Sequence, residues 1–396
     1  MTGVSSHGLL LIDKPQGVTS FDAVAAVRGA LRTKKVGHAG TLDPMATGLL
    51  VVGFGHATRL LQYIVEHDKT YEATIRLGGR TDTDDAEGEA VEPGEAPVVW
   101  PGACDWRALV ERTLRERFTG DIEQVPNTFS AIKINGRRAY DLAREGKDVE
   151  LKARPVHVSE FTVLDARAGF IPARAVGATA EPTDIGRFDP AGYDGDMTPV
   201  LDLDVRVGCS SGTYVRALAR DLGDALGMGG YLTRLRRTRV GRFALSDDAS
   251  ALASTIAPPA STDETSENQT DGASDGTRVR AIGARTETKT YVDREGRIVT
   301  RGRCVLATPP DLSGEKRGDW LRERAIRMDE AARGAMPVLA IDADEARELR
   351  FGRRLHRALP QDGPAAAIVE ATGDVAAIVT RAGARQSKPV VVFPER

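Results

Sequence analysis

The stretch KKVGHAGTLDPMATGLL, residues 34–50, places one carboxylate, Asp43, among small and apolar residues, directly before a proline. Whether this carboxylate takes part in a reaction has to be judged from what else the chain carries. The local pattern also has an ordinary structural interpretation. Asp43 followed by Pro44 is typical of a helix N-cap, where the side chain accepts backbone N–H groups and proline fits the first helical position.

Four other side chains could take part in a reaction, although each has an ordinary interpretation of its own. His38 sits beside glycines in a turn, and Lys14 ends an apolar strand before a Pro-x-Gly turn. Tyr71 fits the core side of a strand. Arg216 begins an amphipathic helix, and the helix dipole does not favour a cation at that end, which hints at function. Taken singly, these residues indicate structure rather than a site.

Several common chemistries lack their motifs. The acidic run at residues 81–89 fails the spacing of a calcium loop, so an acidic hairpin connection is the better interpretation. The nucleotide P-loop, the Gly-x-Ser-x-Gly elbow and the His-Glu-x-x-His helix do not occur. Cys104, Cys209 and Cys304 stand far apart and are expected to be small apolar fillers. These absences remove the commonest named chemistries, and neither a disulfide framework nor a zinc site is supported.

Charge is distributed unevenly along the 396 residues. The net charge is −3, yet residues 251–277 hold five acids and no Lys or Arg, while residues 234–242 hold five arginines. Binding of a polyanion depends on the local field rather than on the sum. No apolar run long enough to span a bilayer and no signal peptide is evident, so we expect a cytoplasmic protein.

Periodicity predicts an α/β or α+β fold. Helical patterns cover residues 19–33, 106–118 and 213–227, and strand patterns cover residues 49–55, 71–79 and 201–212. Asn135-Gly136 predicts a hairpin turn, and residues 291–299 could form another. On the strand 71–79, Glu72, Thr74 and Arg76 are expected on the solvent side.

Three domain ranges follow from these patterns. Residues 1–250 are expected to form the first domain, to which the resemblance given below assigns catalysis, and 168–198 is expected to be a long inserted loop in it. Residues 251–330 are expected to be a largely disordered acidic linker, because the run 251–277 cannot bury enough apolar surface to offset chain entropy. Residues 331–396 form a small β-rich domain.

Four blocks in order resemble one family, the bacterial TruB-type tRNA pseudouridine synthases. They are GHAGTLDPMATGLL, KTYEATIRLGGRTDTDDAEG, GDIEQVPNTFSAIKINGRRAYDLAREG and CSSGTYVRALARDLG. The resemblance covers residues 8–250, with a looser match from 331 that is similar to a PUA-like RNA-binding domain. The chain departs from the family pattern at the inserts 168–198 and 251–325, and at Asn127, where proline is common.

The resemblance implies a pseudouridine synthase fold, with a mixed central β-sheet flanked by helices, and an isomerase without metal or cofactor. It implies that Asp43 is the nucleophile, that Arg216 orients it, and that Tyr71 stacks on the flipped base and assists proton removal. Further substrate-binding residues are implied, some of them also by their positive charge: His38, Lys14, Thr41, Lys133, Arg234, Arg236 and Arg237.

The implied substrate is the T stem-loop of tRNA, modified at uridine 55 by a monomeric enzyme. Lys14 has two implied roles, supporting the catalytic loop or contacting a phosphate, and His38 would fill the place of the extruded base. The alternative is a tRNA-binding or tRNA-folding module without catalysis, which the basic segments and the PUA-like tail would also suit. The sequence leaves open whether C1′ or C6 of the uridine is attacked.

Overall fold

The computed structural model describes residues 6–91, 106–129, 151–183, 197–245, 277–293, 295–359 and 361–395, with short pieces at 133–134, 137–138, 145 and 253–256. Only the backbone is described for 133–134, 137–138, 253–256 and 277–280. The chain forms two compact units: residues 1–67 with 238–396, the first unit, and residues 68–237, the second unit. These units divide the chain differently from the predicted ranges 1–250, 251–330 and 331–396.

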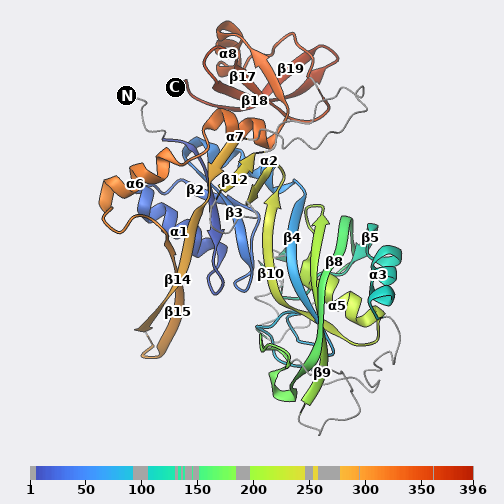
Figure 1. The fold of residues 1–396 in the computed structure, drawn as a ribbon. Helices are drawn as coiled ribbons and strands as arrows, with labels where there is room; N and C mark the ends of the chain where they lie inside the picture. Colours follow the sequence, from blue (N-terminus) through green and yellow to red (C-terminus); the bar gives the residue numbers. More distant parts are fainter. Residues whose placement is uncertain are drawn as a thin grey trace. The chain divides into compact units, whose positions relative to one another are not determined.

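The first unit is built around a mixed sheet (Figure 1). Its elements are β1 (Gly8–Lys14), α1 (Ser20–Leu31), β2 (Val36–Ala39), β3 (Thr47–Phe54), η1 (Gly55–Arg59), α2 (Leu61–Val65), β11 (Phe243–Leu245), β12 (Ala253–Ile256), β13 (Thr277–Arg280), β14 (Ile282–Val292), β15 (Ile298–Leu306), α6 (Gly314–Glu323), α7 (Met328–Ala335), β16 (Val338–Ile341), α8 (Ala343–Arg350), β17 (Ala365–Val369), β18 (Asp374–Gly383) and β19 (Gln386–Val392). Strand β1 pairs antiparallel with β3 and parallel with β14, and β14 pairs antiparallel with β15.

The core of the first unit lies where β1 and β3 meet α7 and the C-terminal strands. Leu9, Leu11, Leu49 and Val51 are fully buried and belong to one cluster with residues of α7, β17 and β18. Strands β1 and β3 are continuous apolar runs, as expected for strands covered on both faces. Strands β16 to β19 form a separate four-stranded sheet, which confirms the predicted small β-rich C-terminal part.

Helix α1 begins and ends as its sequence predicts. Thr19 caps it in a capping box with Asp22, and the apolar stripe Val24, Val27 and Leu31 is buried. The box satisfies backbone N–H groups that the first turn leaves without intrahelical partners. The apolar stripe lies on the face of α1 that packs into the core, and the opposite face of the helix is not part of this packing.

The second unit contains a sheet in the order β10-β4-β9-β8-β5 with helices packed on it. Its elements are β4 (Lys69–Leu77), α3 (Trp106–Arg117), β5 (Gly120–Gln124), β6 (Lys133–Ile134), β7 (Arg137–Arg138), β8 (Arg154–Pro172), η2 (Ala173–Ala175), β9 (Met197–Cys209), α5 (Val215–Ala225) and β10 (Gly230–Val240), whose last residues belong to the first unit. Helix α3 packs on β8, and α5 packs on β4. The mixed β-sheet and the helices of the chain confirm the predicted α/β (α+β) class.

Helix α5 and strand β10 approach each other closely because glycine occupies both sides of the contact. A Cβ atom placed on Gly223 would lie 2.1 Å from the carbonyl carbon of Gly229, closer than any real contact. The apolar stripe of α5 can therefore reach the sheet, with Leu218 and Leu222 fully buried. This packing fixes the helix at whose first turn Arg216 lies.

The predicted solvent side of β4 is wrong in part. Thr74 and Arg76 are buried, and Arg76 makes a two-pronged ion pair with Asp202 of β9, with Nε–Oδ1 and Nη2–Oδ2 distances of 2.7 Å. The alternation of polar and apolar residues along β4 predicted a strand correctly. An arginine can nevertheless be buried where a carboxylate accepts hydrogen bonds from its guanidinium group. Burial on this face follows from the neighbouring strand rather than from β4 itself.

Other segments differ from expectation at their ends. Strand β8 continues to Pro172 and β9 begins at Met197, so the ends of the predicted loop 168–198 are strands. Residues 253–256 form β12, at the start of the run expected to be disordered, and residues 257–276 lie outside the described residues. Residues 282–323 form the hairpin β14–β15 and α6 rather than a linker.

The predicted hairpins are present. Val292 pairs with Ile298 across the β14–β15 turn, and Lys133–Ile134 pairs with Arg137–Arg138. Among the described residues, Cys209 and Cys304 are buried and in no disulfide, as expected for apolar fillers, whereas Cys104 lies outside the described residues. In the described part of the chain, no helix is both long enough and apolar enough to cross a membrane.

Candidate active site

Asp43 lies in the loop between β2 and β3 and is half-buried. The predicted helix N-cap is wrong: the N–H of Ala46 donates to the carbonyl of Asp43 at 3.1 Å, which closes a single turn before β3 begins at Thr47. Asp-Pro suits the start of a turn as well as the start of a helix, and the apolar run that follows here is a strand. The Asp43 side chain is therefore not used to cap a helix.

The Asp43 loop is fastened to α1 by a serine that the sequence did not reveal. The N–H of Leu42 donates to Ser20 Oγ at 2.8 Å, and Ser20 Oγ donates to the carbonyl of Leu42 at 3.0 Å. Ser20 is buried, so water competes little for these bonds. The residue before Asp43 is thus held to the first turn of the helix.

Lys14 supports the same loop from β1. Its side chain is fully buried, and Nζ donates to the carbonyls of Pro15 at 2.9 Å, Val18 at 2.6 Å and Pro44 at 3.3 Å. The N–H of Gly17, whose φ of +81° favours glycine, also donates to the Pro44 carbonyl at 2.8 Å. Of the two roles expected for Lys14, loop support fits this geometry, whereas a buried ammonium group presents nothing to a phosphate.

His38 and Thr41 flank the loop in the first unit. His38 is half-buried on β2, where it pairs with Val52 of β3, and Thr41 is exposed in the loop itself. Both residues precede Asp43 closely in the sequence, because all three belong to the block GHAGTLDP.

Tyr71 lies on β4 in the second unit, paired with Val207 of β9, and its side chain is 8% exposed. Two residues earlier, Lys69 is also buried. Burial and the nearby Arg237 lower the pKa of Lys69 from 10.5 to about 8. A perturbed amine next to the proposed base-stacking tyrosine was not recognised from sequence, because its neighbours come from other strands.

Arg216 is buried at the start of α5, and its charge is balanced within the second unit. Its Nη1 atom lies 3.2 Å from Oδ2 of Asp85, and its guanidinium donates to the carbonyls of Thr83 at 2.9 Å and Phe129 at 3.0 Å. These three partners fix the guanidinium in one orientation. Asp85, from the predicted acidic hairpin, is therefore a site residue that sequence reasoning missed.

The residue before Asp85 in that turn, Asp84, belongs to a second group of polar contacts. It has a left-handed φ of +58°, accepts from Asn127 Nδ2 at 2.6 Å, and lies 3.2 Å from Arg220 Nη1. Burial raises the pKa of Asp84, although the Asn127 bond and the charges of Arg220 and Arg216 act in the opposite direction. Asn127, where the family commonly has proline, thus ties the acidic turn to the segment after β5.

The arginines of β10 that were expected to contact the substrate differ in their exposure. Arg234 is exposed, but donates to Thr74 Oγ1 at 3.1 Å; Arg236 is half-buried; and Arg237 is buried. Successive residues of a strand point to opposite faces, which accounts for the burial of Arg237, and the phosphate contact expected there stays a prediction. Lys133 lies in β6, and its side chain is not described.

The proposed catalytic residues are divided between the two units. Asp43 belongs to the first, with Lys14, His38 and Thr41, while Tyr71 and Arg216 belong to the second. Buried hydrogen bonds hold Lys14 in the first unit, and buried hydrogen bonds with an ion pair hold Arg216 in the second. In the described residues, no cluster of His, Cys, Asp and Glu is arranged to hold a metal.

Two solved structures share the fold. "Structure of H/ACA RNP bound to a substrate RNA containing 2'-deoxyuridine" matches with a TM-score of 0.53 and 20% identity, over 98% of this chain and 86% of that chain. "Crystal Structure of a Cbf5-Nop10-Gar1 Complex" matches with a TM-score of 0.54 and 20% identity, over 99% and 84%. At this identity the likeness defines the fold, that of pseudouridine synthases.

The sequence comparisons define the family. Residues 28–215 match the model of the TruB family pseudouridylate synthase N-terminal domain, residues 216–264 that of the tRNA pseudouridylate synthase B C-terminal domain, and residues 336–394 that of tRNA pseudouridine synthase II, C-terminal. The tRNA pseudouridine synthase B of Bifidobacterium longum (strain NCC 2705) is 60% identical over 100% of both chains, and that of Arthrobacter sp. (strain FB24) is 41% identical over 98% of this chain and 96% of its own. The chain belongs to the TruB family of tRNA pseudouridine synthases, and it is an isomerase.

Proposed function

We propose that this protein converts uridine 55 in the T loop of tRNA to pseudouridine, with Asp43 as the nucleophile. The observation that carries the proposal is the support of the Asp43 loop. Lys14 and Gly17 bind the Pro44 carbonyl on one side of Asp43, and Ser20 binds Leu42 on the other. A carboxylate in a loop held from both sides is pre-organised for attack, because little freedom has to be lost in the transition state.

The chemistry needs only groups of the chain and the substrate. The Asp43 carboxylate attacks C1′ or C6 of the uridine, the bond from N1 to C1′ breaks, and the uracil turns so that C5 joins C1′. The bond between Asp43 and the substrate carbon then breaks, which returns the free carboxylate. The C5 proton leaves and N1 gains a proton, so substrate and product have the same atoms. No metal, cofactor or redox partner is required.

Tyr71 acts on the base of the substrate, and Arg216 acts on the nucleophile. The tyrosine ring stacks on the flipped base, and its hydroxyl assists proton removal from C5. Arg216 orients the Asp43 carboxylate; its position is set by the ion pair with Asp85 and by two backbone carbonyls. An arginine that is already held in place loses little further freedom when substrate binds.

Recognition of the T stem-loop is proposed to depend on shape and on phosphates. The target base has to leave its stack, and His38 beside the Asp43 loop takes the vacated place with its ring. Exposed Thr41 and Arg234 contact the RNA, together with Arg236 and Lys133. The C-terminal sheet acts as a PUA-like RNA-binding domain, and the enzyme works as a cytoplasmic monomer.

The test uses tRNA transcribed with 5-³H-uridine, from which pseudouridine formation releases tritium. Asp43→Asn removes the nucleophile but keeps the size of the side chain, so we expect tritium release to fall below detection while the Kd for tRNA changes less than threefold. Asp121→Asn is the matched control, because Asp121 is an exposed residue of β5 paired with His157, and it should retain full activity.

Two outcomes would contradict the proposal. Full activity of Asp43→Asn would remove Asp43 from the chemistry. Tight binding of tRNA by the wild-type protein without any tritium release would favour a tRNA-binding or tRNA-folding module instead.

A further inference from the structure

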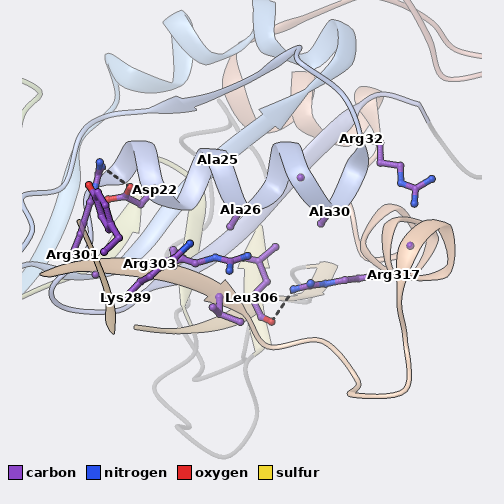
Figure 2. Close-up of a pocket in the computed structure, with 16 residues that line it drawn as sticks. Asp22, Ala25, Ala26, Ala30, Arg32, Lys289, Arg301, Arg303, Leu306 and Arg317 are labelled. Carbon is purple, nitrogen blue, oxygen red and sulfur yellow. Dashed lines mark hydrogen bonds and ion pairs between the residues drawn. The ribbon is translucent and has the colours of Figure 1, made fainter. Parts of the chain in front are cut away.

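A groove in the first unit lies outside the residues assigned to the reaction. It is a cavity of about 610 Å³ between α1, the hairpin β14–β15 and α6 (Figure 2). Its α1 side is made of small residues, Ala25, Ala26, Gly29 and Ala30. We call it the hairpin groove. Its hairpin and α6 come from the segment in which the chain departs from the family pattern.

The groove is strongly cationic. Arg32, Lys289, Arg301, Arg303 and Arg317 line it, and among the described lining residues Asp22 is the one acid. Asp22 is already committed to Arg301, with Oδ1 and Nη2 2.9 Å apart (Figure 2). The acid therefore neutralises one cation and leaves the others facing the same space.

Several of these cations pair with no carboxylate among the residues that the structure describes. Within the described residues, Arg32, Lys289 and Arg303 make no ion pair, and all three side chains are exposed. Arg317 donates through Nη2 to the carbonyl of Leu306 at 3.4 Å, while its Nε is buried and lacks a hydrogen-bond partner in that part of the chain. Arginine donors grouped in this way suit phosphate oxygens, which accept two parallel N–H bonds.

The charge of the groove belongs to this segment rather than to the chain as a whole. Residues 278–324 carry twelve Lys and Arg against seven Asp and Glu, in a chain whose net charge is −3. A local excess of this kind raises the concentration of polyanions near the surface even when the whole protein is acidic.

The hairpin also reaches the support of the proposed nucleophile. Thr286 Oγ1 donates to the carbonyl of Gln16 at 2.5 Å, and the N–H of the next residue, Gly17, donates to the Pro44 carbonyl at 2.8 Å. Gly302 packs so closely on Gly17 that an added Cβ would lie 2.3 Å from the Gly17 oxygen. The base of the hairpin and the Asp43 loop are therefore neighbours within the first unit.

We propose that the hairpin groove binds the phosphodiester backbone of the substrate tRNA, at phosphates other than that of the flipped uridine. The groove contributes affinity and placement rather than chemistry, because its cations are not part of the reacting set. This inference rests on the proposed function in that tRNA is taken to be the substrate.

The experiment compares two double variants of the full-length chain. Lys289→Gln with Arg303→Gln removes two groove cations that make no ion pair with a described residue. Arg285→Gln with Arg297→Gln removes two arginines of the same hairpin that do not line the groove and that pair with Glu287 and Asp293. All four side chains are exposed, so both proteins should fold, and thermal melting checks this. The Kd for unmodified tRNA is measured as a function of salt, and KM and kcat are measured at one salt concentration.

Loss of two phosphate contacts should reduce the slope of log affinity against log salt by about 1.5 and weaken binding at least about tenfold near 0.1 M salt. We expect KM to rise in parallel and kcat to stay within twofold, while the control pair shifts Kd less than twofold. The charge-retaining variant Lys289→Arg with Arg303→Lys should keep the wild-type slope.

An unchanged slope and Kd in the groove variant, or an equal loss in the control pair, would overturn the groove proposal. The wild-type protein decides the function separately. If it forms pseudouridine and the groove variant binds normally, only the groove proposal fails; if it forms none but binding depends on the groove, only the proposed function fails.

Discussion

Two buried lysines in this chain, Lys14 and Lys69, have different surroundings and therefore different roles. Lys14 is buried, and its ammonium group donates to three carbonyl groups. These hydrogen bonds replace those to water and hold the Asp43 loop in place. Lys69 is buried beside the cation of Arg237, and its pKa is lowered to about 8. A lysine at the end of a strand is therefore not informative until its partners are known.

The shifted pKa of Lys69 makes a prediction about stability. Lysine in the unfolded chain has a pKa of about 10.4, so between about pH 8 and about pH 10 the unfolded chain holds more protons than the folded protein. The free energy of unfolding should rise with pH across this range through Lys69, and Lys69→Met should lack this contribution. Urea unfolding of both proteins at several pH values measures the difference, in which the other groups cancel.

The wild-type protein should gain stability relative to Lys69→Met as the pH rises from 8 to 10. A difference that stays constant, or that reverses its sign, would contradict the assignment of a lowered pKa to Lys69.

Site residues were predictable where a motif carried them and not where a distant partner did. The block around Asp43 identified the loop, and the resemblance named Tyr71 and Arg216 as its proposed companions. Asp85 was assigned to an acidic turn because its Arg216 partner is far away in sequence. The burial of Arg237 depends on how β10 sits among its neighbouring strands, which the run of arginines does not encode.

At the scale of elements, the turn at residues 81–90 and helix α5 are joined by the ion pair between Asp85 and Arg216. Both side chains are buried, and Asp85 Oδ1 is separately occupied by Thr83 Oγ1 at 2.7 Å and the N–H of Glu87 at 3.0 Å. The carboxylate thus uses one oxygen for its own turn and the other for the helix. Because the two oxygens have separate partners, a substitution can remove the ion pair and keep the hydrogen bonds of the turn.

Asp85→Asn can keep the Oδ1 contacts and removes the charge that faces Arg216. Because it leaves a buried arginine without its counter-charge, we expect a loss of about 3–5 kcal/mol in the free energy of unfolding. Asp82→Asn in the same turn is the control, since Asp82 is exposed and its Oδ1 contact with the Glu89 N–H survives in Asn. Urea unfolding of the two variants should differ by most of that amount, and equal stabilities would contradict the coupling of turn and helix.

Elements with strong periodicity were predicted well, and local ambiguities were not. The patterns located α1, α3, α5 and β4 because an apolar stripe or alternation recurs over several turns or pairs. Asp43-Pro44 was assigned to a helix because a single dipeptide serves both turns and helix starts. The ends of 168–198 and of 251–277 are strands because pairing with distant segments outweighs their weak local preference.

For the whole molecule, the net charge does not indicate how charge is distributed among its parts. A net charge of −3 gives no sign of the hairpin groove, where five cations share one acid. The compact units also join residues 1–67 to the C-terminal part, whereas the predicted ranges followed the order of the chain. Such grouping is set by long-range strand pairing, such as that of β1 with β14, which no stretch of sequence announces.

The central claim is that this chain isomerises one uridine of the T loop through the Asp43 loop. The direct measurement is position-by-position mapping of pseudouridine in unmodified tRNA transcripts after incubation with the wild-type protein. We expect pseudouridine at position 55 alone. Its absence from position 55, or its formation at other uridines instead, would contradict the account.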